Sequence, residues 1–515
     1  MATLVDDLKV RAEEVPERIA IWFEEEDTIT FSELWKQAVK VAEALQKSGV
    51  KRNDKVFVYI QNSIELVESI YGVWIAGATC VPINVMWKKD EIMEDIKTTE
   101  SKWGITNQRN LPEIKRVAEA WDFKGIYVFG SKETLNPPFH NFEPLLATCQ
   151  GEYANLPPIH EEDIGVIIHT GGTSGDMKAA VITHGSYNQT VTNLVESNTG
   201  KKAPLPPVDE TEPPNIIALP LYHGGGLQSF NFAIKAGRSV VLMEKFETVK
   251  FARLVEKHKI KTIVCMPTMI QMLANEKEPI TLSSLKFVLC TGGALTAAVQ
   301  KQFTERFGVP IGQNYGSTEA GHLAGTSYRD IKMGNFKPGA VGRPYKGVTL
   351  KIVDENGNEL PPGQTGEIVA FSKGAMQGYL KKEGSGSVSD EIVKNGWVYT
   401  GDLGYLDEDG YLFIVGRKRD IIKCGGFQVY PVEIENCLLK HPAVKEVAVI
   451  GAKDDRLGEI PKAFIVKKEG YNLTAEDVIA YCRENLAKYK AVRQVVFVDS
   501  LPKNEAGKVL KRLLS

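Results

Sequence analysis

Two hydrophobic patterns alternate over the first hundred residues. Thr30 and Glu33 have the spacing of a capping box, and the apolar residues after them recur on one helical face. The segment at 55–60 is mostly apolar, which predicts a buried strand. A second helical pattern follows at 63–76, and a short apolar strand at 79–85. This order of strand, helix and strand predicts a parallel sheet with crossover helices.

The same rhythm returns in the middle of the chain. Between Thr199 and Asn215 the sequence is polar and rich in proline, which indicates a surface loop. Further strand-like runs, each followed by a helix-like segment, lie at 216–221, 239–243, 262–266 and 286–290. We therefore expect parallel α/β structure over most of the chain.

The pattern changes twice towards the C-terminus. Near 345–415 apolar residues alternate around Asn-Gly and Pro-Gly turns, which predicts an antiparallel, barrel-like β subdomain. After the charged stretch 416–420, strand-like segments and one helical pattern predict a small α+β domain. The expected fold is thus α/β, with a large N-terminal domain over 1–418 and a small C-terminal domain over 419–515.

Composition narrows the classes of partner. The chain of 515 residues has 62 Lys and Arg against 65 Asp and Glu, a net charge of −3, so we expect no broad basic surface for nucleic acid. Seven scattered cysteines without a CxxC pair predict neither a disulfide framework nor a structural zinc site. The N-terminus lacks the apolar core of a secretion signal, and the most apolar stretch, 72–85, is too short for a membrane span. We therefore expect a cytoplasmic protein without a transmembrane segment.

One glycine-rich stretch has the chemistry of an anion-binding loop. Glycines allow backbone N–H groups to turn towards an anion, hydroxyls add donors, and a lysine adds positive charge. The candidate residues are Thr170, Gly171, Gly172, Thr173, Ser174, Gly175 and Lys178. The stretch is not a Walker A loop, because Asp176 stands where the second glycine belongs. An exposed hairpin is the alternative interpretation of this stretch alone.

Four later stretches carry further reactive side chains. The segment 313–319 combines an aromatic ring, hydroxyls and a carboxylate, and 399–402 ends in an acid after a turn. The segment 416–420 is basic, and 502–508 places a lysine in a turn near the C-terminus. Each of them alone is more typical of a turn or a solvated linker.

In this order, the five stretches resemble the motifs of the adenylate-forming superfamily, which includes acyl-CoA synthetases. The resemblance covers nearly the whole chain. It implies an ATP-dependent acid–CoA ligase, which joins a carboxylic acid to AMP with release of pyrophosphate and then transfers the acyl group to the thiol of CoA. The implied cofactors are ATP, Mg²⁺ and CoA as co-substrate. Two alternatives stay open, namely an enzyme that loads a carrier protein in trans and a non-catalytic relative that binds nucleotide or acyl groups.

The resemblance also implies roles for the motif residues of the large domain. The glycine-rich loop would contact the β- and γ-phosphates of ATP, and Thr318 the α-phosphate. Glu319 would ligate Mg²⁺. The other implied nucleotide-binding residues are Gly293 and Ala294 along the adenine and acyl pocket, Asn314, Tyr315 and Gly316 at the adenine, and Asp402 and Arg417 at the ribose and phosphates.

For the small domain, the resemblance implies two orientations. Arg419 falls at the family's hinge, about which the domain rotates between the half-reactions. Lys508 matches the lysine needed for adenylation. After rotation, Lys423 would approach the active site, and Gly425 and Gly426 would flank the tunnel for the pantetheine arm of CoA.

The glycine-rich loop departs from the family pattern at three positions. Gly171 replaces a hydroxyl residue, Met177 a proline and Ala179 a glycine. We expect the lost hydroxyl and the lost proline to soften ATP binding, whereas Lys178 and the backbone donors are retained.

The stretch 219–226 narrows the class of carboxylic acid that we expect as substrate, but it does not identify the acid. Relatives that activate amino acids carry an aspartate there for the substrate ammonium, but this chain has His223 and three glycines. A buried ammonium without a counter-charge is costly, so an amino acid is disfavoured. His223 is expected to border the acyl pocket, although a histidine satisfied within the core is the alternative. The three glycines leave room for a bulky or ring-shaped acid. The sequence does not determine the oligomeric state, so a homo-oligomer stays open.

Overall fold

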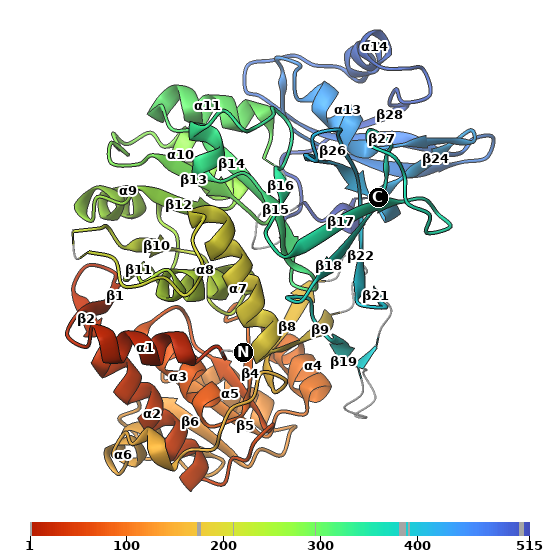
Figure 1. Ribbon diagram of the computed structural model, residues 1–515. Coiled ribbons are helices and arrows are strands. Elements are labelled where there is room, and N and C mark those ends of the chain that lie inside the picture. Colours follow the sequence, from red (N-terminus) through yellow and green to blue (C-terminus); the bar gives the residue numbers. More distant parts are fainter. Residues whose placement is uncertain are drawn as a thin grey trace.

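The computed structural model describes residues 3–171, 177–209, 211–293, 295–380, 388–389, 392–503 and 509–514. Within these residues the strands form four sheets, and Figure 1 shows them following one another from the N-terminal body to the C-terminal unit. The two largest sheets are mixed, with parallel centres and antiparallel pairing at one edge of one sheet and at both edges of the other. We name each sheet after one of its strands.

The β8 sheet has the order β20-β19-β9-β8-β4-β3-β5-β6-β7. Its pairings from β8 through β7 are parallel, as the strand-helix rhythm predicted, whereas β8, β9, β19 and β20 pair antiparallel. Its strands are β3 (Lys55–Tyr59), β4 (Thr79–Pro82), β5 (Trp103–Asn107), β6 (Gly125–Phe129), β7 (Phe139–Asn141), β8 (Ile164–Gly171), β9 (Met177–Thr183), β19 (Gly378–Leu380) and β20 (Val388–Ser389).

The β14 sheet has the order β16-β15-β14-β13-β12-β10-β11-β1-β2. Its strands are β1 (Ile19–Phe23), β2 (Asp27–Thr30), β10 (Asn215–Ile217), β11 (Val240–Leu242), β12 (Thr262–Cys265), β13 (Phe287–Cys290), β14 (Ile311–Ser317), β15 (Gly321–Gly325) and β16 (Arg343–Pro344). The strand predicted at 216–221 already ends at Ile217, because the chain bends at Leu219 and then turns, with the Pro220 carbonyl accepting from the His223 N–H at 3.2 Å.

The predicted antiparallel region forms the β22 sheet, except for one segment. This sheet contains β17 (Val348–Val353), β18 (Gly366–Ser372), β21 (Val393–Lys394), β22 (Trp397–Leu406) and β23 (Leu412–Arg417), all paired antiparallel. The excepted segment carries β19, which leaves its sequence neighbours and pairs with β9 of the β8 sheet. A strand from the C-terminal half of the chain thereby continues the glycine-rich hairpin.

The last hundred residues have a sheet and a core of their own. Figure 1 shows this unit in blue, beside the large body. The β27 sheet contains β24 (Ile422–Cys424), β25 (Phe427–Val429), β26 (Val444–Asp454), β27 (Gly458–Lys467) and β28 (Gln494–Phe497). Its buried cluster consists only of residues from 422 to 492. Such a self-contained core is what a separately folding unit needs.

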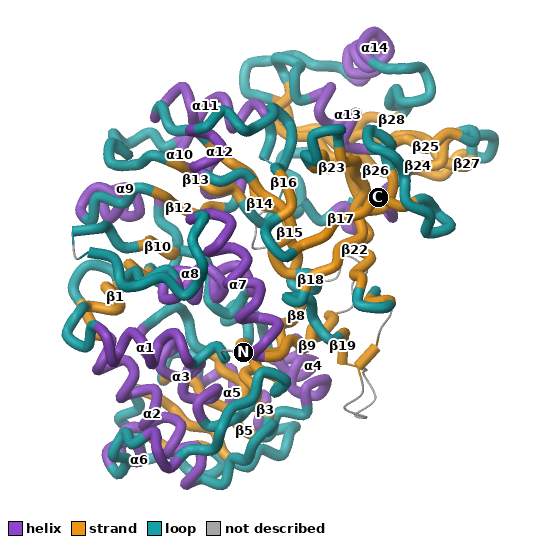
Figure 2. Tube along the Cα trace, viewed as in Figure 1, coloured by secondary structure: helices purple, strands orange, loops and turns teal. Residues whose placement is uncertain are grey.

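Helices cover the sheets, and Figure 2 distinguishes the helices, in purple, from the strands, in orange. The predicted capping box at Thr30 and Glu33 is present. No helix among the described residues is long and apolar enough to cross a membrane. The helices are α1 (Asp6–Glu14), α2 (Phe31–Lys47), α3 (Ile64–Ile75), α4 (Lys89–Thr99), α5 (Leu111–Ala118), α6 (Phe142–Ala147), α7 (His184–Thr199), α8 (Gly224–Lys235), α9 (Thr248–Lys257), α10 (Pro267–Asn275), α11 (Ala297–Phe307), α12 (Tyr328–Lys332), α13 (Pro431–Leu438) and α14 (Ala475–Asn485), with short 3-10 turns at Tyr153–Asn155, Lys418–Asp420 and Lys511–Leu513.

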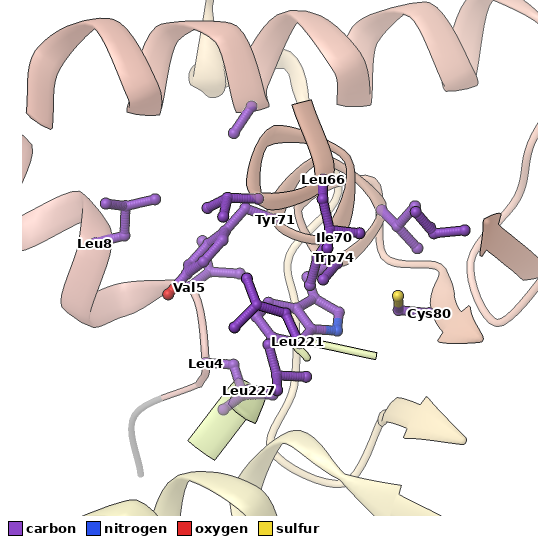
Figure 3. Packing of buried hydrophobic residues seen from close by; sticks show 14 of the residues in the cluster. Leu4, Val5, Leu8, Leu66, Ile70, Tyr71, Trp74, Cys80, Leu221 and Leu227 are labelled. Carbon is purple, nitrogen blue, oxygen red and sulfur yellow. The ribbon is translucent and has the colours of Figure 1, made fainter. Parts of the chain in front are cut away.

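The largest core joins the two main sheets through α3 and α8. Tyr71 and Trp74 project from α3 towards Leu221 and Leu227 (Figure 3). Both aromatic side chains also satisfy their polar atoms, because Trp74 Nε1 donates to the Gly165 carbonyl at 2.8 Å and the Tyr71 hydroxyl bonds an asparagine of α8. This packing fixes the start of α8 relative to β8, on which the glycine-rich loop stands.

Candidate active site

The ends of the glycine-rich loop are held by an antiparallel ladder. Thr170 pairs with Lys178, and Gly171 with Met177, so β8 and β9 close the loop at its base. Gly172, Thr173, Ser174 and Gly175 lie outside the described residues. The ammonium of Lys178 lies 5.0 Å from the ring centroid of Tyr379, a residue of the neighbouring strand β19.

The carboxyl ends of β12, β13 and β14 bring several predicted residues to one edge of the β14 sheet, the edge where α/β sheets bind ligands. Gly292 and Gly293 directly follow β13, and Gly292 has a φ of +80°, which favours glycine. A Cβ on Gly293 would lie 3.5 Å from Pro267. Ala294 lies outside the described residues. These glycines let the loop after β13 pass close to the start of α10.

Asn314 is a hub of hydrogen bonds within the protein. Its Nδ2 donates to Thr291 Oγ1 at 2.9 Å and lies 3.0 Å from Nδ1 of His322, while its Oδ1 accepts from the Tyr345 hydroxyl at 2.8 Å. Burial lowers the pKa of His322 to about 4, so its ring is neutral at pH 7 and can accept this hydrogen bond. The network fixes the end of β14 to the loop after β13.

Gly316 is required by the same hairpin. A Cβ there would lie 2.3 Å from the Gly321 carbonyl, so only glycine lets β14 and β15 approach. The position predicted to touch the nucleotide therefore has a structural role as well.

Tyr315, Asp402 and Arg417 form a continuous polar chain between two sheets. The Tyr315 hydroxyl donates to Asp402 Oδ2 at 2.9 Å, and Arg417 Nε lies 3.0 Å from Asp402 Oδ1. Burial, and then the charge of Asp402, raise the pKa of the Tyr315 phenol well above its usual value, so it stays a donor. Asp402 and Arg417 face each other in the β22–β23 ladder. Asp402 thus joins the two other residues predicted for the nucleotide, Tyr315 and Arg417.

A hollow of about 330 Å³ opens beside this chain. It is lined by Thr400, Gly401, Arg417, Lys418 and Arg419. Three of these side chains are basic, which suits a phosphate-bearing ligand. Lys418 is paired with Glu367 at 2.6 Å. The predicted hinge residue Arg419 and the predicted phosphate contact Arg417 therefore line the same hollow.

The start of α8 lies against Thr318. A Cβ on Gly224 would be 3.7 Å from Thr318 Oγ1 and 3.7 Å from Ile168 of β8. His223 immediately precedes this helix, and its ring packs edge-on against Tyr222 at 4.8 Å. The histidine-glycine stretch and the predicted α-phosphate contact are therefore neighbours.

The carboxylate of Glu319 is held by a tyrosine. Its Oε1 accepts the hydroxyl of Tyr379 at 2.7 Å. One such bond leaves lone pairs on both carboxylate oxygens. Mg²⁺ in nucleotide sites is held by one or two carboxylates together with the substrate phosphates, so this donor fits a magnesium ion that arrives with ATP.

The small-domain residues form a separate group. Gly425 and Gly426 make the turn between β24 and β25 with φ values of +59° and +84°, and the Gly425 N–H donates to the Leu457 carbonyl at 2.8 Å. The backbone of Lys423 is bonded to Glu459 of the same unit at 2.8 Å. Lys508 lies outside the described residues. None of the described contacts above joins this group to the Asp402 chain.

Sequence patterns missed the side chains that support the predicted ones. These are Thr291, His322, Tyr345 and Tyr379. Their partners lie 8 to 60 residues away in the sequence and meet them only in the folded chain, so no local pattern marks them. For Tyr379, the one usable sequence signal is a tyrosine directly after a glycine in a strand-like segment.

Family comparison matches almost the entire chain. Residues 8–380 match the AMP-binding enzyme family, and residues 433–508 match the AMP-binding enzyme C-terminal domain. The chain therefore belongs to the AMP-binding enzymes, the adenylate-forming acyl-CoA synthetase family. The family predicted from the five motifs is confirmed.

Curated relatives share the full length of the chain. A 2-succinylbenzoate–CoA ligase of Bacillus cereus (strain AH820) is 32% identical over 515 residues, which cover all of this chain and 98% of the relative. A long-chain-fatty-acid–CoA ligase of Bacillus subtilis (strain 168) is 30% identical over 99% of this chain and 94% of the relative. The present chain is accordingly an AMP-forming acid–thiol ligase, as predicted.

Solved structures confirm the predicted α/β fold class. ATP-bound MatB from Rhodopseudomonas palustris is 27% identical, with a TM-score of 0.87 over 99% of this chain and 98% of that one. O-succinylbenzoate CoA synthetase (MenE) from Bacillus subtilis, in complex with the acyl-adenylate intermediate OSB-AMP, is 27% identical with a TM-score of 0.83 over 99% and 97%. The latter enzyme is also known with ATP and a magnesium ion. ATP, Mg²⁺ and CoA are the cofactor and co-substrates of this class of ligase.

Proposed function

We propose that this acid–CoA ligase carries out both half-reactions at the edge where the β8, β14 and β22 sheets meet. The observation that carries the assignment is the polar chain from Tyr315 through Asp402 to Arg417, beside the basic hollow. Asp402 would bind the ribose hydroxyls, and Arg417 the ribose or the phosphates. Tyr315 would stack on the adenine, and Asn314 would hold its edge.

The first half-reaction brings anions together, so it needs concentrated positive charge. The carboxylate of the acid attacks the α-phosphorus of ATP, a P–O bond to the β-phosphate breaks, and pyrophosphate leaves with the electron pair. Lys178 and the loop backbone would hold the outgoing phosphates, while Thr318 would orient the α-phosphate. Glu319 would hold Mg²⁺, which neutralises the developing charge. Lys508 would contact the acid and the α-phosphate.

The second half-reaction needs a different set of residues. The thiolate of CoA attacks the acyl carbonyl, the mixed anhydride breaks, and AMP leaves. We assign this step to a rotated position of the small domain 419–515 about Arg419, relative to the body 1–418. The turn at Gly425 and Gly426 would then flank the pantetheine arm, with Lys423 nearby.

The acid that we propose has an apolar body and no ammonium group. A Cβ on Gly224 would lie 3.7 Å from Ile168, and a Cβ on Gly292 would lie 3.7 Å from Met266, so apolar side chains lie beside glycines of two predicted site segments. His223 would mark the entrance of this pocket at the start of α8. By their names, the two curated relatives act on 2-succinylbenzoate and on a long-chain fatty acid, and neither of these acids carries an ammonium group.

The test measures pyrophosphate release with ATP across aliphatic, aryl and alicyclic acids, with and without CoA. We expect release with apolar acids, thioester formation only with CoA, and little reaction with amino acids. Adenylate without thioester would favour the alternative in which a carrier protein accepts the acyl group. No release with any acid would favour the non-catalytic alternative.

A matched pair of variants checks that the proposed site is responsible. Glu319→Gln should lower pyrophosphate release at least about 100-fold, because the amide is a poor ligand for a hard cation. Glu305→Gln, at an exposed position of α11, should leave the rate unchanged. The cytoplasmic location and a homo-oligomer stay predictions, to be checked by cell fractionation and by sedimentation of the purified enzyme.

A further inference from the structure

Residues 374–380 join three parts of the site that are distant in the sequence. The Met376 N–H donates to the Glu319 carbonyl at 2.9 Å, and the Gln377 N–H donates to the Val181 carbonyl of β9 at 2.8 Å. The Gly374 carbonyl accepts from the Thr190 hydroxyl of α7 at 3.0 Å. We call residues 374–380 the strap. It fixes the loop after β14 to the strand that leaves the glycine-rich loop.

Tyr379 is the side chain of the strap that reaches both proposed charge carriers. Its hydroxyl donates to Glu319 Oε1 at 2.7 Å, and its ring lies 5.0 Å from the ammonium of Lys178. The side chain is 8% exposed, so this hydrogen bond competes little with water. A hydrogen bond to a carboxylate is stronger than one between neutral groups, and the buried ring restricts the phenol to one position.

Two backbone features keep the strap close to α7. A Cβ on Gly374 would lie 2.1 Å from Thr190 Oγ1, and one on Gly321 would lie 2.5 Å from the same oxygen. Gly321 also has a φ of +73°, which disfavours any side chain. The close backbone contacts of the strap therefore fix the position of Tyr379, without the help of a flexible side chain.

We propose that Tyr379 is a positioning residue for the adenylation step, which holds the Glu319 carboxylate in the rotamer that receives Mg²⁺·ATP while its ring seats Lys178. This inference rests on the proposed function of Glu319 as magnesium ligand. Groups that hydrogen-bond a metal ligand fix its orientation, and losing one typically costs 10–100-fold in metal affinity. The hydroxyl and the ring of Tyr379 thereby have separable effects.

The experiment measures ATP binding by calorimetry in the absence of any acid, over a series of magnesium concentrations. Tyr379→Phe keeps the ring and removes the hydroxyl. We expect it to raise the magnesium concentration for half-maximal ATP binding roughly tenfold, with ATP affinity in excess EDTA unchanged. Tyr379→Leu should in addition weaken ATP binding in EDTA, because the ammonium of Lys178 loses its contact with the aromatic ring.

Two controls separate this role from general support of the fold. Tyr127→Phe removes the hydroxyl of another buried tyrosine, on β6, and should leave the magnesium dependence unchanged. In a Glu319→Gln background, Tyr379→Phe should have no further effect on the magnesium dependence, because the group it positions is gone. The unfolding midpoint of Tyr379→Phe should lie close to that of the wild type.

The possible failures are distinct. Unchanged magnesium dependence in Tyr379→Phe, with a normal dependence in the wild type, would overturn the positioning role and leave the proposed function intact. A wild type that binds ATP without any magnesium dependence would overturn the assignment of Glu319 and the role of Tyr379 together. An equal loss in the Glu319→Gln background would show that Tyr379 acts elsewhere, which also overturns the proposal.

Discussion

Among single residues, burial sets the protonation of the histidines that support the site. Burial lowers the pKa of His184, which directly follows β9, to about 4. Its ring packs edge-on against Trp74 with centroids 6.0 Å apart, and a Cβ on Gly165 would lie 3.3 Å from it. The ring is therefore neutral at pH 7, within the core that holds β8 and α8 together.

Acid should weaken the fold through His184. Its folded pKa of about 4 lies below the usual 6.5, so between pH 6.5 and 4 the unfolded chain binds a proton that the native chain does not. Stability is thus fully present above pH 6.5 and falls as the pH is lowered through this window, by up to about 3 kcal/mol at pH 4. Urea titrations between pH 7 and pH 4.5 should give a shallower decline for His184→Gln. A decline as steep as that of the wild type would contradict this assignment.

A buried histidine–aspartate pair lies at the base of the glycine-rich loop. His169 Nδ1 lies 2.9 Å from Asp95 Oδ2, with side chains 3% and 0% exposed. His169 stands on β8 directly before the loop, and Asp95 on α4. Removing one member would leave the other buried without its partner.

We expect His169→Leu to lower the free energy of unfolding by about 3 kcal/mol or more, because the Asp95 carboxylate would lose its compensating group. The double variant His169→Leu/Asp95→Leu should recover much of that loss, since no buried polar group is then left unpaired. Chemical denaturation of both variants measures the effect. A double variant less stable than either single variant would refute the compensation argument.

At the scale of elements, the start of α8 shows that adjacent positions can carry glycine for different physical reasons. A Cβ on Gly226 would lie 2.1 Å from the Pro220 carbonyl, whereas one on Gly225 would meet nothing within 4 Å. The clash is with backbone, which cannot move aside as a side-chain tip would. Gly226 is therefore required by the bend before the helix, whereas a side chain at Gly225 would point into open space.

This difference predicts opposite outcomes for two neighbouring substitutions. Gly226→Ala should lower the free energy of unfolding by about 1–3 kcal/mol, as overpacking does. Gly225→Ala should be neutral or stabilise by up to about 1 kcal/mol through helix propensity, and it serves as the matched control. Thermal or urea unfolding measures both. Equal effects of the two substitutions would show that the bend at Pro220 does not require glycine.

Elements were predictable where the cause is local and were missed where it is distant. The capping box at Thr30 and the parallel run of β3, β4 and β5 follow from neighbouring residues, and both are present. The departure of β19 to the β8 sheet depends on pairing with β9, about two hundred residues earlier, so the pattern near 345–415 could not reveal it. The support of Glu319 by Tyr379 was hidden for the same reason.

At the scale of the whole molecule, the small C-terminal unit touches the body at few described points. A Cβ on Gly416 would lie 3.8 Å from Val432 of α13, and Gln428 contacts Glu355 at 3.4 Å. The core of the unit is its own. Motif residues such as Asp402 and Arg417 could be found from the sequence because each lies in a short recognisable stretch, but the sequence could not show that they touch. A unit with few contacts to the body and its own core is the arrangement that rotation requires.

Rotation predicts that two substitutions on the small unit separate the half-reactions. Lys508→Ala should lower adenylation at least about 100-fold, since one cation at the reacting phosphate is lost, yet spare thioester formation from a supplied acyl-adenylate. Gly426→Trp should do the reverse, because the open space at the turn between β24 and β25 would be filled. Gly426→Ala is the matched control, since it imposes the same backbone strain at a φ of +84° without the bulk. Stopped-flow measurement of the rate of each half-reaction shows which step each variant impairs. Equal loss of both half-reactions in Lys508→Ala would mean that one fixed arrangement serves both steps, which would contradict the proposed rotation about Arg419.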